Sequence, residues 1–589
     1  MAVGAASRVS LRCVVKRRAP VIAGLGVIVA LPALFVGFHD DDFVHRLALS
    51  GGSALYRRDA FSLYEFLRDE AENRRLMDAG LIPWFSDPGL KIRFFRPLSS
   101  LLTAFDAAVF GSAALPAIVH SLLWFALAAF LVTRIHRELV TARAAFWSSL
   151  LFVLGGSHAG NTAWIAARHV LVGGAFALGA WYCELRTEKS QSGWLRPLST
   201  GLFVVGLAAS EATLTVLPFL LGSIAFRRAA VRQRVLSALP FVAASLAYLV
   251  FYELAGYGSA RMGSYVSPFE TPLRFALELG QRVPQLAAEA FSGFPAVLGS
   301  FDEGVRRALI AVGYLAFGLV TVLFLRHRAR LEENNSRSLV WLPFAFALSL
   351  LPVAGTILDG RVLLVPLAGS SLLLGSLIVL GQEAGERGAG ERRWPSRIGL
   401  IALFTLHLGV SPVVRVVVTA TSARIADLES AMPRKARLRC AEGARVLLIN
   451  GSDPAIGLYA GIILAAAGQG RWAGWHVLSM ASNDLELRRD GPNAFVLRTL
   501  GERRAHFAER LYRPEPIAAG ARVELANLTV DVLSSAEGGP TRTRFELGTP
   551  LDEACFVRWQ GDADGYLESV ILPVKGPLFI PHVPGPMGR

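Results

Sequence analysis

The chain has 589 residues, of which 53% are hydrophobic and only 18% are charged. Soluble domains carry about 25% charged residues, so this balance excludes an ordinary soluble protein and indicates an integral membrane protein. The net charge of +14 does not indicate nucleic-acid binding, because the basic residues stand in short clusters between apolar runs. Such clusters are typical of cytoplasmic loops under the positive-inside rule.

The first long apolar run covers residues 19–38 and follows a basic stretch at residues 1–18. About 20 apolar residues suffice to cross a bilayer, so we expect a transmembrane helix here. The basic flank predicts a cytoplasmic N-terminus, which places the acidic cluster Asp40-Asp41-Asp42 on the outer side. Because carboxylates at a membrane face are costly to desolvate, this cluster is a candidate functional site.

Two long outer loops are expected, at residues 39–115 and 255–306. Within the first loop, residues 64–77 have helical composition. Residues 98–110 are apolar but short for a span, which favours an interfacial or re-entrant helix. The second loop contains an amphipathic stretch at residues 273–291.

Ten further apolar runs follow the first, and each run predicted to point inward meets arginine at its end. This pattern predicts about eleven spans in a membrane domain over residues 19–420, with everything after it outside. The ten runs cover residues 116–132, 144–155, 164–183, 198–209, 213–226, 235–254, 308–325, 339–357, 362–380 and 398–418.

After a linker at residues 421–439, residues 440–589 are predicted to form a small β-rich outer domain. Long apolar runs disappear there, and short alternating segments are separated by turn signals such as those at residues 490–493 and 538–540. Cys440 and Cys555 either pair in an oxidising compartment or remain two buried thiols, and both alternatives are open. The domain contains no motif that indicates a function.

Four short motifs, in order and on one predicted side, carry a resemblance to a known family. They are Asp41-Asp42 after the first span, Arg96-Pro97-Leu98 followed by Phe110-Gly111, Trp164-Ile165-Ala166-Ala167-Arg168, and Ala209-Ser210-Glu211. Over about residues 19–380 the chain resembles the GT-C superfamily of multi-span glycosyltransferases, which includes the protein O-mannosyltransferases. It departs from the pattern where His169 follows Arg168 and where the usual Lys before Glu211 is missing. These departures leave the donor sugar and the exact acceptor open.

The resemblance implies transfer of a sugar from a polyprenyl-phosphate carrier to an acceptor at the outer face of the membrane. The acceptor is left open as a protein, a lipid or a glycan. An inverting displacement needs a carboxylate to take the proton of the acceptor hydroxyl, and Asp41 or Asp42 is expected to serve as this general base. Asp40 and His45 are expected in supporting roles. The preference for arginine over lysine is typical of GC-rich bacterial genes, so we expect the bacterial inner membrane.

The departing phosphate needs cationic stabilisation, and three arginines at predicted outer ends of spans are candidates: Arg96, Arg168 and Arg361. Glu211 is expected either as an ion-pair partner of Arg168 or as a helix cap. A divalent cation is an open possibility, since no group of His, Asp and Glu has a dependable metal spacing.

Two alternatives come from other functional classes. A transporter or flippase of a lipid-linked molecule would show inverted repeats and charges near the bilayer midplane, whereas the charges here gather at span ends. A non-catalytic relative that only binds glycan would have lost the acidic pair, which this chain retains.

Overall fold

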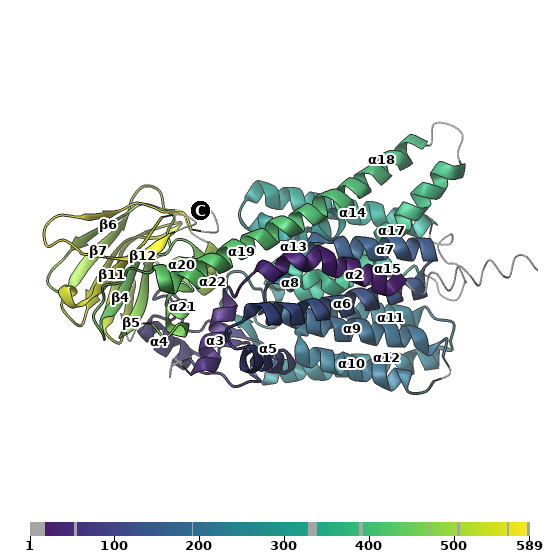
Figure 1. Cartoon of the computed structure of the whole chain (residues 1–589), viewed down its shortest axis with the longest axis horizontal. Coiled ribbons are helices and arrows are strands. Elements are labelled where there is room, and N and C mark those ends of the chain that lie inside the picture. The colour runs from purple at the N-terminus through teal and green to yellow at the C-terminus, as the bar shows by residue number, and fades with distance from the viewer. Residues whose placement is uncertain are drawn as a thin grey trace, which may run out of the picture.

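A computed structural model describes residues 18–51, 56–190, 192–327, 339–387, 393–469, 472–503, 507–561 and 565–585. A long helical domain lies at one end of the molecule and a C-terminal domain of strands, residues 440–585, lies at the other (Figure 1). A loop region, residues 36–96, lies between them. The predicted combination of a helical membrane domain and a β-rich C-terminal domain is confirmed. The basic stretch at residues 1–17 lies outside the described residues.

The helical domain is built mainly of α-helices, with short 3-10 and π segments at several of their ends. Its elements are α2 (Arg18–Ala30), η1 (Leu31–Phe35), α5 (Pro97–Phe110), α6 (Ala114–Leu139), α7 (Ala142–Leu154), η2 (Gly156–His158), α8 (Ala159–Ala163), α9 (Arg168–Thr187), α10 (Leu195–Ala209), η3 (Glu211–Val216), α11 (Leu217–Ala225), α12 (Val231–Leu254), α13 (Pro272–Ser292), η4 (Ala296–Ser300), α14 (Glu303–His327), α15 (Leu342–Ser349), α16 (Leu351–Ala354), η6 (Gly360–Leu363), α17 (Leu364–Arg387), α18 (Arg393–Phe404), η7 (Thr405–Val410) and α19 (Ser411–Lys435).

Among the described residues, five helices are long and apolar enough to cross a membrane, or six if one bent pair counts as a single span. The bent pair is Gly156–Ala163 with Arg168–Thr187. Several of the other predicted runs form shorter apolar helices of 10–17 residues. The count of about eleven spans therefore stays a prediction.

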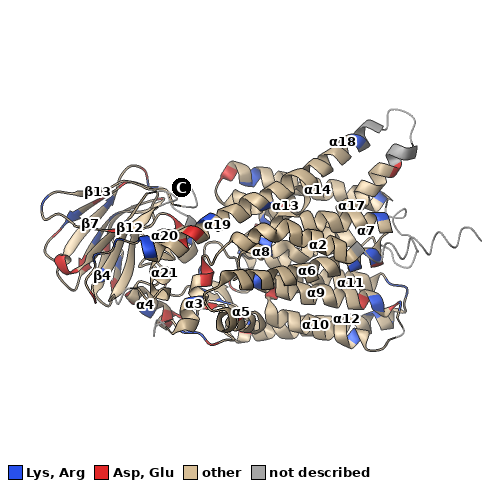
Figure 2. Ribbon diagram, in the orientation of Figure 1, with Lys and Arg blue, Asp and Glu red and all other residues tan. Residues whose placement is uncertain are grey.

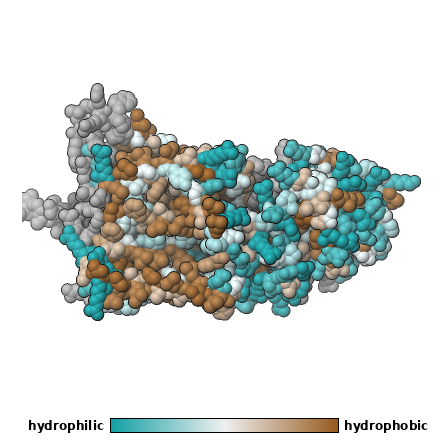
Figure 3. Space-filling model, turned by 180° about the vertical axis from the view of Figure 1, so that it is seen from behind, coloured by the Kyte–Doolittle hydropathy of each residue, from teal (hydrophilic) through white to brown (hydrophobic). Residues whose placement is uncertain are grey.

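Burial differs strongly between the helices of the bundle. The apolar window of the span at Gly360–Glu383, which includes most of α17, is 89% buried inside the protein, whereas that of α14 is only 22% buried. Where α17 passes α7, a Cβ added at Gly375 would lie 2.4 Å from the backbone nitrogen of Ser148, so a small residue is needed there. On the face seen in Figure 3, apolar side chains cover most of the helical domain, as expected for a surface that faces lipid.

Charged residues are scarce along the bundle and gather near its two ends (Figure 2). The end remote from the C-terminal domain carries basic residues, including Arg137 in the last turn of α6 and Arg186 in the last turn of α9. The opposite end, which faces the loop region, carries the acidic cluster that the sequence singled out.

The loop region contains α3 (Asp41–Ser50), β1 (Glu65–Leu67), α4 (Glu70–Ala79) and β2 (Lys91–Arg93). With β3 (Gly258–Ala260), its strands form a three-stranded sheet in the order β1-β2-β3. The helix expected at residues 64–77 therefore begins later than predicted. The Asp69 side chain accepts a hydrogen bond from the Glu72 N–H and caps α4, so the residues before it are free to pair as a strand.

The C-terminal domain contains two sheets. A six-stranded antiparallel sheet has the order β13-β6-β7-β10-β9-β8, and a four-stranded sheet has the order β12-β11-β4-β5. In the second sheet, β4 pairs in parallel with both β5 and β11, and two short helices connect β4 to β5, as a parallel pair requires. The elements are β4 (Arg445–Asn450), α20 (Pro454–Gly457), α21 (Ala460–Ala466), β5 (Gly474–Ser479), β6 (Leu485–Arg489), β7 (Ala494–Thr499), α22 (Phe507–Tyr512), β8 (Arg522–Leu525), β9 (Leu528–Ala536), β10 (Gly539–Leu547), η8 (Leu551–Glu553), β11 (Cys555–Gln560), β12 (Tyr566–Val570) and β13 (Leu578–Ile580).

The loop region packs directly on the C-terminal domain. The Trp84 indole N–H donates to the Leu478 carbonyl at 3.1 Å, and Arg513 Nε donates to the Phe85 carbonyl at 2.8 Å. Gly80 ends α4 with a φ of +71°, and a Cβ there would lie 1.9 Å from a backbone oxygen of β5. Only glycine fits this conformation and this approach, so the residue after α4 brings the two parts into contact.

Helix α19 continues to Lys435, through most of the segment expected as a linker. The domain therefore follows a helix that also forms part of the bundle, which limits its freedom to move. Cys440 and Cys555 form a disulfide that joins the start of the domain to β11. Of the two alternatives for these cysteines, the structure has the bonded one.

Candidate active site

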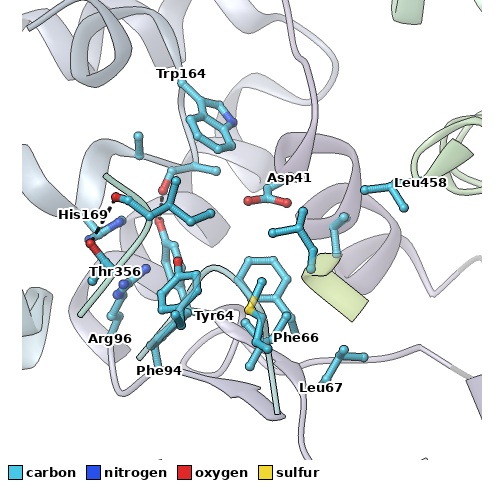
Figure 4. Close-up of a pocket in the computed structure, with 18 of the residues that line it drawn as sticks. Asp41, Tyr64, Phe66, Leu67, Phe94, Arg96, Trp164, His169, Thr356 and Leu458 are labelled. Atoms are coloured by element: carbon cyan, nitrogen blue, oxygen red, sulfur yellow. Dashed lines mark hydrogen bonds between the residues drawn. The ribbon is translucent and has the colours of Figure 1, made fainter. Parts of the chain in front are cut away.

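A cavity of about 260 Å³ lies where the helical domain, the loop region and the C-terminal domain meet. Four of the predicted site residues line it: Asp41, Arg96, Glu211 and Arg361. Each stands at the start of a helical segment, because these segments begin at the end of the bundle that faces the loop region. In Figure 4, Asp41 lies between Leu458 on one side and His169 and Arg96 on the other, below Trp164.

Asp41 is the first residue of α3, and its carboxylate lies at the cavity. The Tyr459 hydroxyl, from the C-terminal domain, donates to Asp41 Oδ1 at 2.8 Å. Burial raises the pKa of Asp41, while the Tyr459 hydrogen bond and the positive charge of Arg361 act in the opposite direction. A raised pKa makes a carboxylate a stronger base when it is ionised.

The other two aspartates of the cluster do not line this cavity. Asp42 accepts hydrogen bonds from the Ala166 N–H at 2.7 Å and the His39 N–H at 3.2 Å, and burial raises its pKa to about 6. Asp42 therefore ties α3 to the turn before α9. The backbone N–H of Asp40 donates to Glu429 Oε2 at 2.8 Å, and burial together with the charge of Asp41 raises the pKa of Asp40 to about 7.

Arg96 and Glu211 form an ion pair at the cavity. Arg96 donates from Nε to Glu211 Oε2 at 2.9 Å and from Nη2 to the other carboxylate oxygen. The guanidinium also lies over the rings of Phe94 and Tyr64, at 4.4 and 5.0 Å from their centroids. Its plane is therefore held in one orientation, with its charge largely balanced by Glu211.

Arg361 is held more loosely. Its guanidinium lies 4.5 Å from the centroid of the Trp164 ring, and its Nε is 3.9 Å from Asp359 Oδ2. That distance exceeds hydrogen-bond length, and no described residue accepts a hydrogen bond from the guanidinium, so Arg361 keeps donors available at the cavity. Its place in the fold comes from its backbone, whose N–H donates to Asp359 Oδ1 at 2.9 Å in a tight turn.

Arg168 lies outside the cavity lining, in contrast to the other two arginines. It is 2% exposed, pairs through Nη1 with Asp106, and donates from Nε to Ser121 Oγ at 2.9 Å. Its Nη2 donates to the Ala117 carbonyl at 2.6 Å. Of the two alternatives for Glu211, the pairing with Arg168 is wrong, because Asp106 of α5 pairs with Arg168 instead. Glu211 is not the helix cap either: it is the first residue of η3, whose N-cap is Ser210.

His45 is buried on α3 between the rings of Tyr64 and Phe66, at centroid distances of 4.9 and 5.6 Å. Burial lowers its pKa to about 3, which keeps the imidazole neutral. Its position indicates packing under the cavity wall.

Sequence reasoning missed several residues that line the cavity, among them Tyr64, Trp164 and Tyr459 as site residues. Tyr459 is separated from Asp41 by 418 positions and belongs to no motif, so no sequence signal could have found it. His169 also lines the cavity and contacts Ser210 Oγ at 2.9 Å. Its position directly after Arg168, at the start of an apolar helix, was the available signal.

The three aspartates do not converge as a ligand set for a divalent cation, because the Asp42 carboxylate is occupied by backbone N–H groups. Within the part of the chain that the structure describes, no group of three or more His, Cys, Asp and Glu residues could hold a metal ion. The residues present therefore do not fit a resident cation held by protein groups alone.

No family model matches the chain, and no curated protein matches its sequence. Among solved structures, it is similar to the oligosaccharyltransferase AglB of Archaeoglobus fulgidus in complex with an inhibitory peptide and a dolichol-phosphate, with a TM-score of 0.37 and 13% identity. The match covers 78% of this chain and 64% of AglB, just under two thirds of its length.

A second similar structure is ArnT of Cupriavidus metallidurans bound to undecaprenyl phosphate, with a TM-score of 0.31 and 12% identity. The match covers 78% of this chain and 89% of ArnT. A further structure of the A. fulgidus oligosaccharyltransferase, tethered to an acceptor peptide, has a TM-score of 0.41 at 12% identity, over 78% of this chain and 64% of that one. Scores at this level do not identify an activity, so function must be argued from the residues of the chain itself.

Proposed function

We propose that this protein is a membrane glycosyltransferase of the GT-C type, which moves a sugar from a polyprenyl-phosphate donor to a hydroxyl acceptor. The observation that carries this proposal is the convergence of Asp41, Arg96, Glu211 and Arg361 on one cavity at the end of the helical bundle. These residues are the acidic and basic groups that sugar transfer from a phosphate requires.

Asp41 is the proposed general base. It takes the proton of the acceptor hydroxyl while that oxygen forms a bond to the anomeric carbon of the sugar. The bond between the anomeric carbon and the phosphate oxygen breaks, and the polyprenyl phosphate leaves with the electron pair. Of the two candidates that the sequence left open, Asp41 is favoured over Asp42 because the carboxylate of Asp42 is already engaged by two backbone N–H groups.

Arg361 is the proposed main contact of the donor phosphate, because its guanidinium keeps free donors near Asp41. Arg96 is proposed to assist, with Glu211 holding it in place. Helices α5 and α9 also begin at this end of the bundle, and the partial positive charge of a helix N-terminus favours phosphate. Arg168 is not included in the phosphate site, since its donors are satisfied inside the protein.

The proposed orientation puts the N-terminus in the cytoplasm and the C-terminal domain outside a bacterial inner membrane. The arginines in the last turns of α6 and α9, at the end remote from the C-terminal domain, support this orientation through the positive-inside rule. The Cys440–Cys555 disulfide supports it as well, because disulfides persist in oxidising compartments.

The test compares membranes that contain the wild type, Asp41→Asn or Asp59→Asn, each supplied with a panel of radiolabelled polyprenyl-phosphate sugars. Asp59 is an exposed aspartate of the same loop region and serves as the matched control. We expect release of sugar from the carrier by the wild type and the control. For Asp41→Asn we expect a rate lower by about 100-fold or more, the usual scale of general-base loss.

Full turnover by Asp41→Asn would disprove the role of this base. If no donor is consumed by the wild type while labelled lipid crosses the bilayer, the protein is a flippase and the proposal is wrong.

A further inference from the structure

His169 lines the cavity but holds none of the roles proposed above. It is the second residue of α9 and is only partly buried. Its Nδ1 lies 2.9 Å from the Ser210 Oγ. The other ring nitrogen, Nε2, forms no hydrogen bond with a described residue, and the protein does not enclose it. Nε2 is therefore open to a ligand.

The hydrogen bonds of Ser210 determine which nitrogen of His169 carries the ring proton. Ser210 is 0% exposed, so its hydroxyl proton needs an acceptor inside the protein. The Oγ already accepts a hydrogen bond from the Ala212 N–H at 3.2 Å, and within the described chain its other polar contact is His169 Nδ1. The hydroxyl therefore donates to Nδ1. A neutral imidazole that accepts at Nδ1 carries its proton on Nε2, so His169 presents an N–H donor to the cavity.

The position of His169 relative to the proposed base indicates which part of the substrate it meets. In Figure 4, His169 and Arg96 lie together at one side of the cavity, and Asp41 lies apart from them. In an inverting displacement, the acceptor oxygen attacks the anomeric carbon from the face opposite the leaving group. The base and the departing phosphate therefore stand on opposite sides of the sugar. With Asp41 as the base, the side that carries His169 is the side of the phosphate.

The charges near His169 favour the same ligand group. The guanidiniums of Arg96 and Arg361 both act on the ring. Arg96 is paired with Glu211, which leaves Arg361 as the unpaired positive charge of the two. The first turn of α9 adds the partial positive charge of a helix N-terminus. An ionised phosphate oxygen only accepts hydrogen bonds, so it matches this combination of an N–H donor and positive charge.

We infer that His169 binds the phosphate of the donor through its Nε2–H, beside Arg361. This inference rests on the proposed transferase function and adds a binding residue to it. Ser210 acts as the positioning residue, because its hydroxyl holds the imidazole in the tautomer that donates to the cavity. Negative charge grows on the phosphate as its bond to the sugar breaks, so the same N–H also stabilises the leaving group.

The experiment measures binding of a polyprenyl phosphate that carries no sugar to the purified full-length protein in detergent. The wild type is compared with His169→Leu, His169→Gln and His169→Glu. Glutamine and glutamate have nearly the same shape, but only glutamine offers an N–H donor, whereas an ionised glutamate repels phosphate. His582→Leu is the control, because His582 belongs to the C-terminal domain and does not line the cavity.

For His169→Leu we expect the Kd to rise about 10- to 100-fold, the scale of a hydrogen bond to a charged group. His169→Gln should bind more tightly than His169→Leu, because it restores a donor, and His169→Glu should bind most weakly. The control should bind as the wild type does. If His169→Leu melts at a lower temperature, the comparison of the glutamine and glutamate variants still decides, because both are polar and equal in size.

An equal Kd in the wild type, His169→Gln and His169→Glu would overturn the inference. A higher KM for the complete donor, with an unchanged Kd for the sugar-free carrier, would assign His169 to the sugar and would overturn it as well. In both cases the wild type still binds the carrier, and the proposed function stands. A wild type that neither binds the carrier nor consumes any donor would contradict the proposed function itself, and the inference would fall with it.

Discussion

Arg168 and Arg361 lie near the same end of the helical bundle, but Arg168 is buried and only Arg361 lines the cavity. Around Arg168, the guanidinium is enclosed by Asp106, Ser121 and the Ala117 carbonyl, and every group of the side chain has a partner. Around Arg361, the guanidinium faces a cavity beside Asp41 and rests on Trp164.

A buried charge close to a membrane face therefore does not by itself mark a functional site. A closed ion pair stabilises the helix arrangement, because removal of one partner leaves the other charged and buried. An arginine at a cavity is able to bind a ligand, because its donors are not used in hydrogen bonds within the protein. The variants below separate these two roles.

The largest effect is expected for Arg168→Met. It leaves Asp106 charged and buried without its main partner, at a cost of about 3–5 kcal/mol of stability. We expect a strongly lowered melting temperature in detergent and a reduced yield of folded protein. Arg361→Met is the matched control and should melt close to the wild type. If Arg168→Met melted normally and lost only activity, Arg168 would belong to the functional site after all.

Arg361→Gln is expected to reduce kcat/KM for the donor by about 10- to 100-fold, the scale of a charge-assisted hydrogen bond to phosphate. Its melting temperature should change little, because the guanidinium stacks on Trp164 but donates no hydrogen bond to a described residue. Arg361→Lys keeps the charge but not the bidentate geometry, so we expect only partial recovery. Steady-state kinetics with varied donor checks the result, and equal activity in all three forms would contradict it.

A smaller effect is expected for Tyr459→Phe, which removes the hydrogen bond to Asp41. That bond favours the ionised carboxylate, so its loss raises the pKa of Asp41. As the pH is lowered, the base then becomes protonated, and the enzyme loses activity, at a higher pH than in the wild type. We expect the acid limb of the pH profile of kcat to move up by about one unit, since such bonds are worth about 1.5–3 kcal/mol.

Tyr314→Phe is the control for this change, because the Tyr314 hydroxyl donates to the Gly280 carbonyl, far from Asp41 in the chain. If the acid limb lies at the same pH in Tyr459→Phe and in the wild type, the pKa of Asp41 does not depend on the hydrogen bond from the C-terminal domain.

The smallest effect is expected for Asp40→Asn. Burial, with the charges of Asp41 and Asp453, raises the pKa of Asp40 to about 7 from an ordinary 3.8. The folded state therefore favours the protonated form, and its stability falls as pH rises from about 4 to 7. An asparagine mimics that neutral form, so it should raise the melting temperature more at pH 8 than at pH 5. Asp59→Asn serves as the exposed control, and an equal shift at both pH values would contradict the expectation.

The sequence alone predicted the two-part architecture, and it named four of the residues that line the cavity. Apolar runs of sufficient length identify helices that can cross a membrane, because a bilayer tolerates only backbone whose polar groups are paired. Short segments between turn signals identified strands such as β4 and β11. The short helices between β4 and β5 carried no comparable signal in the sequence. Short motifs brought Asp41, Arg96 and Glu211 into consideration, and Arg361 was a candidate because it stands at a predicted outer end of a span.

Tertiary structure decided which of these residues share a cavity. Asp41 and Asp42 are neighbours in the chain, but successive residues of a helix point about 100° apart, so one faces the cavity and the other a backbone turn. In the sequence, Arg168 and Arg361 are both arginines near the ends of apolar runs and cannot be distinguished. In the structure, Asp106 on a neighbouring helix pairs with Arg168 and keeps it away from the cavity. Tyr459 reaches Asp41 through a contact between segments 418 positions apart, which local pattern cannot encode.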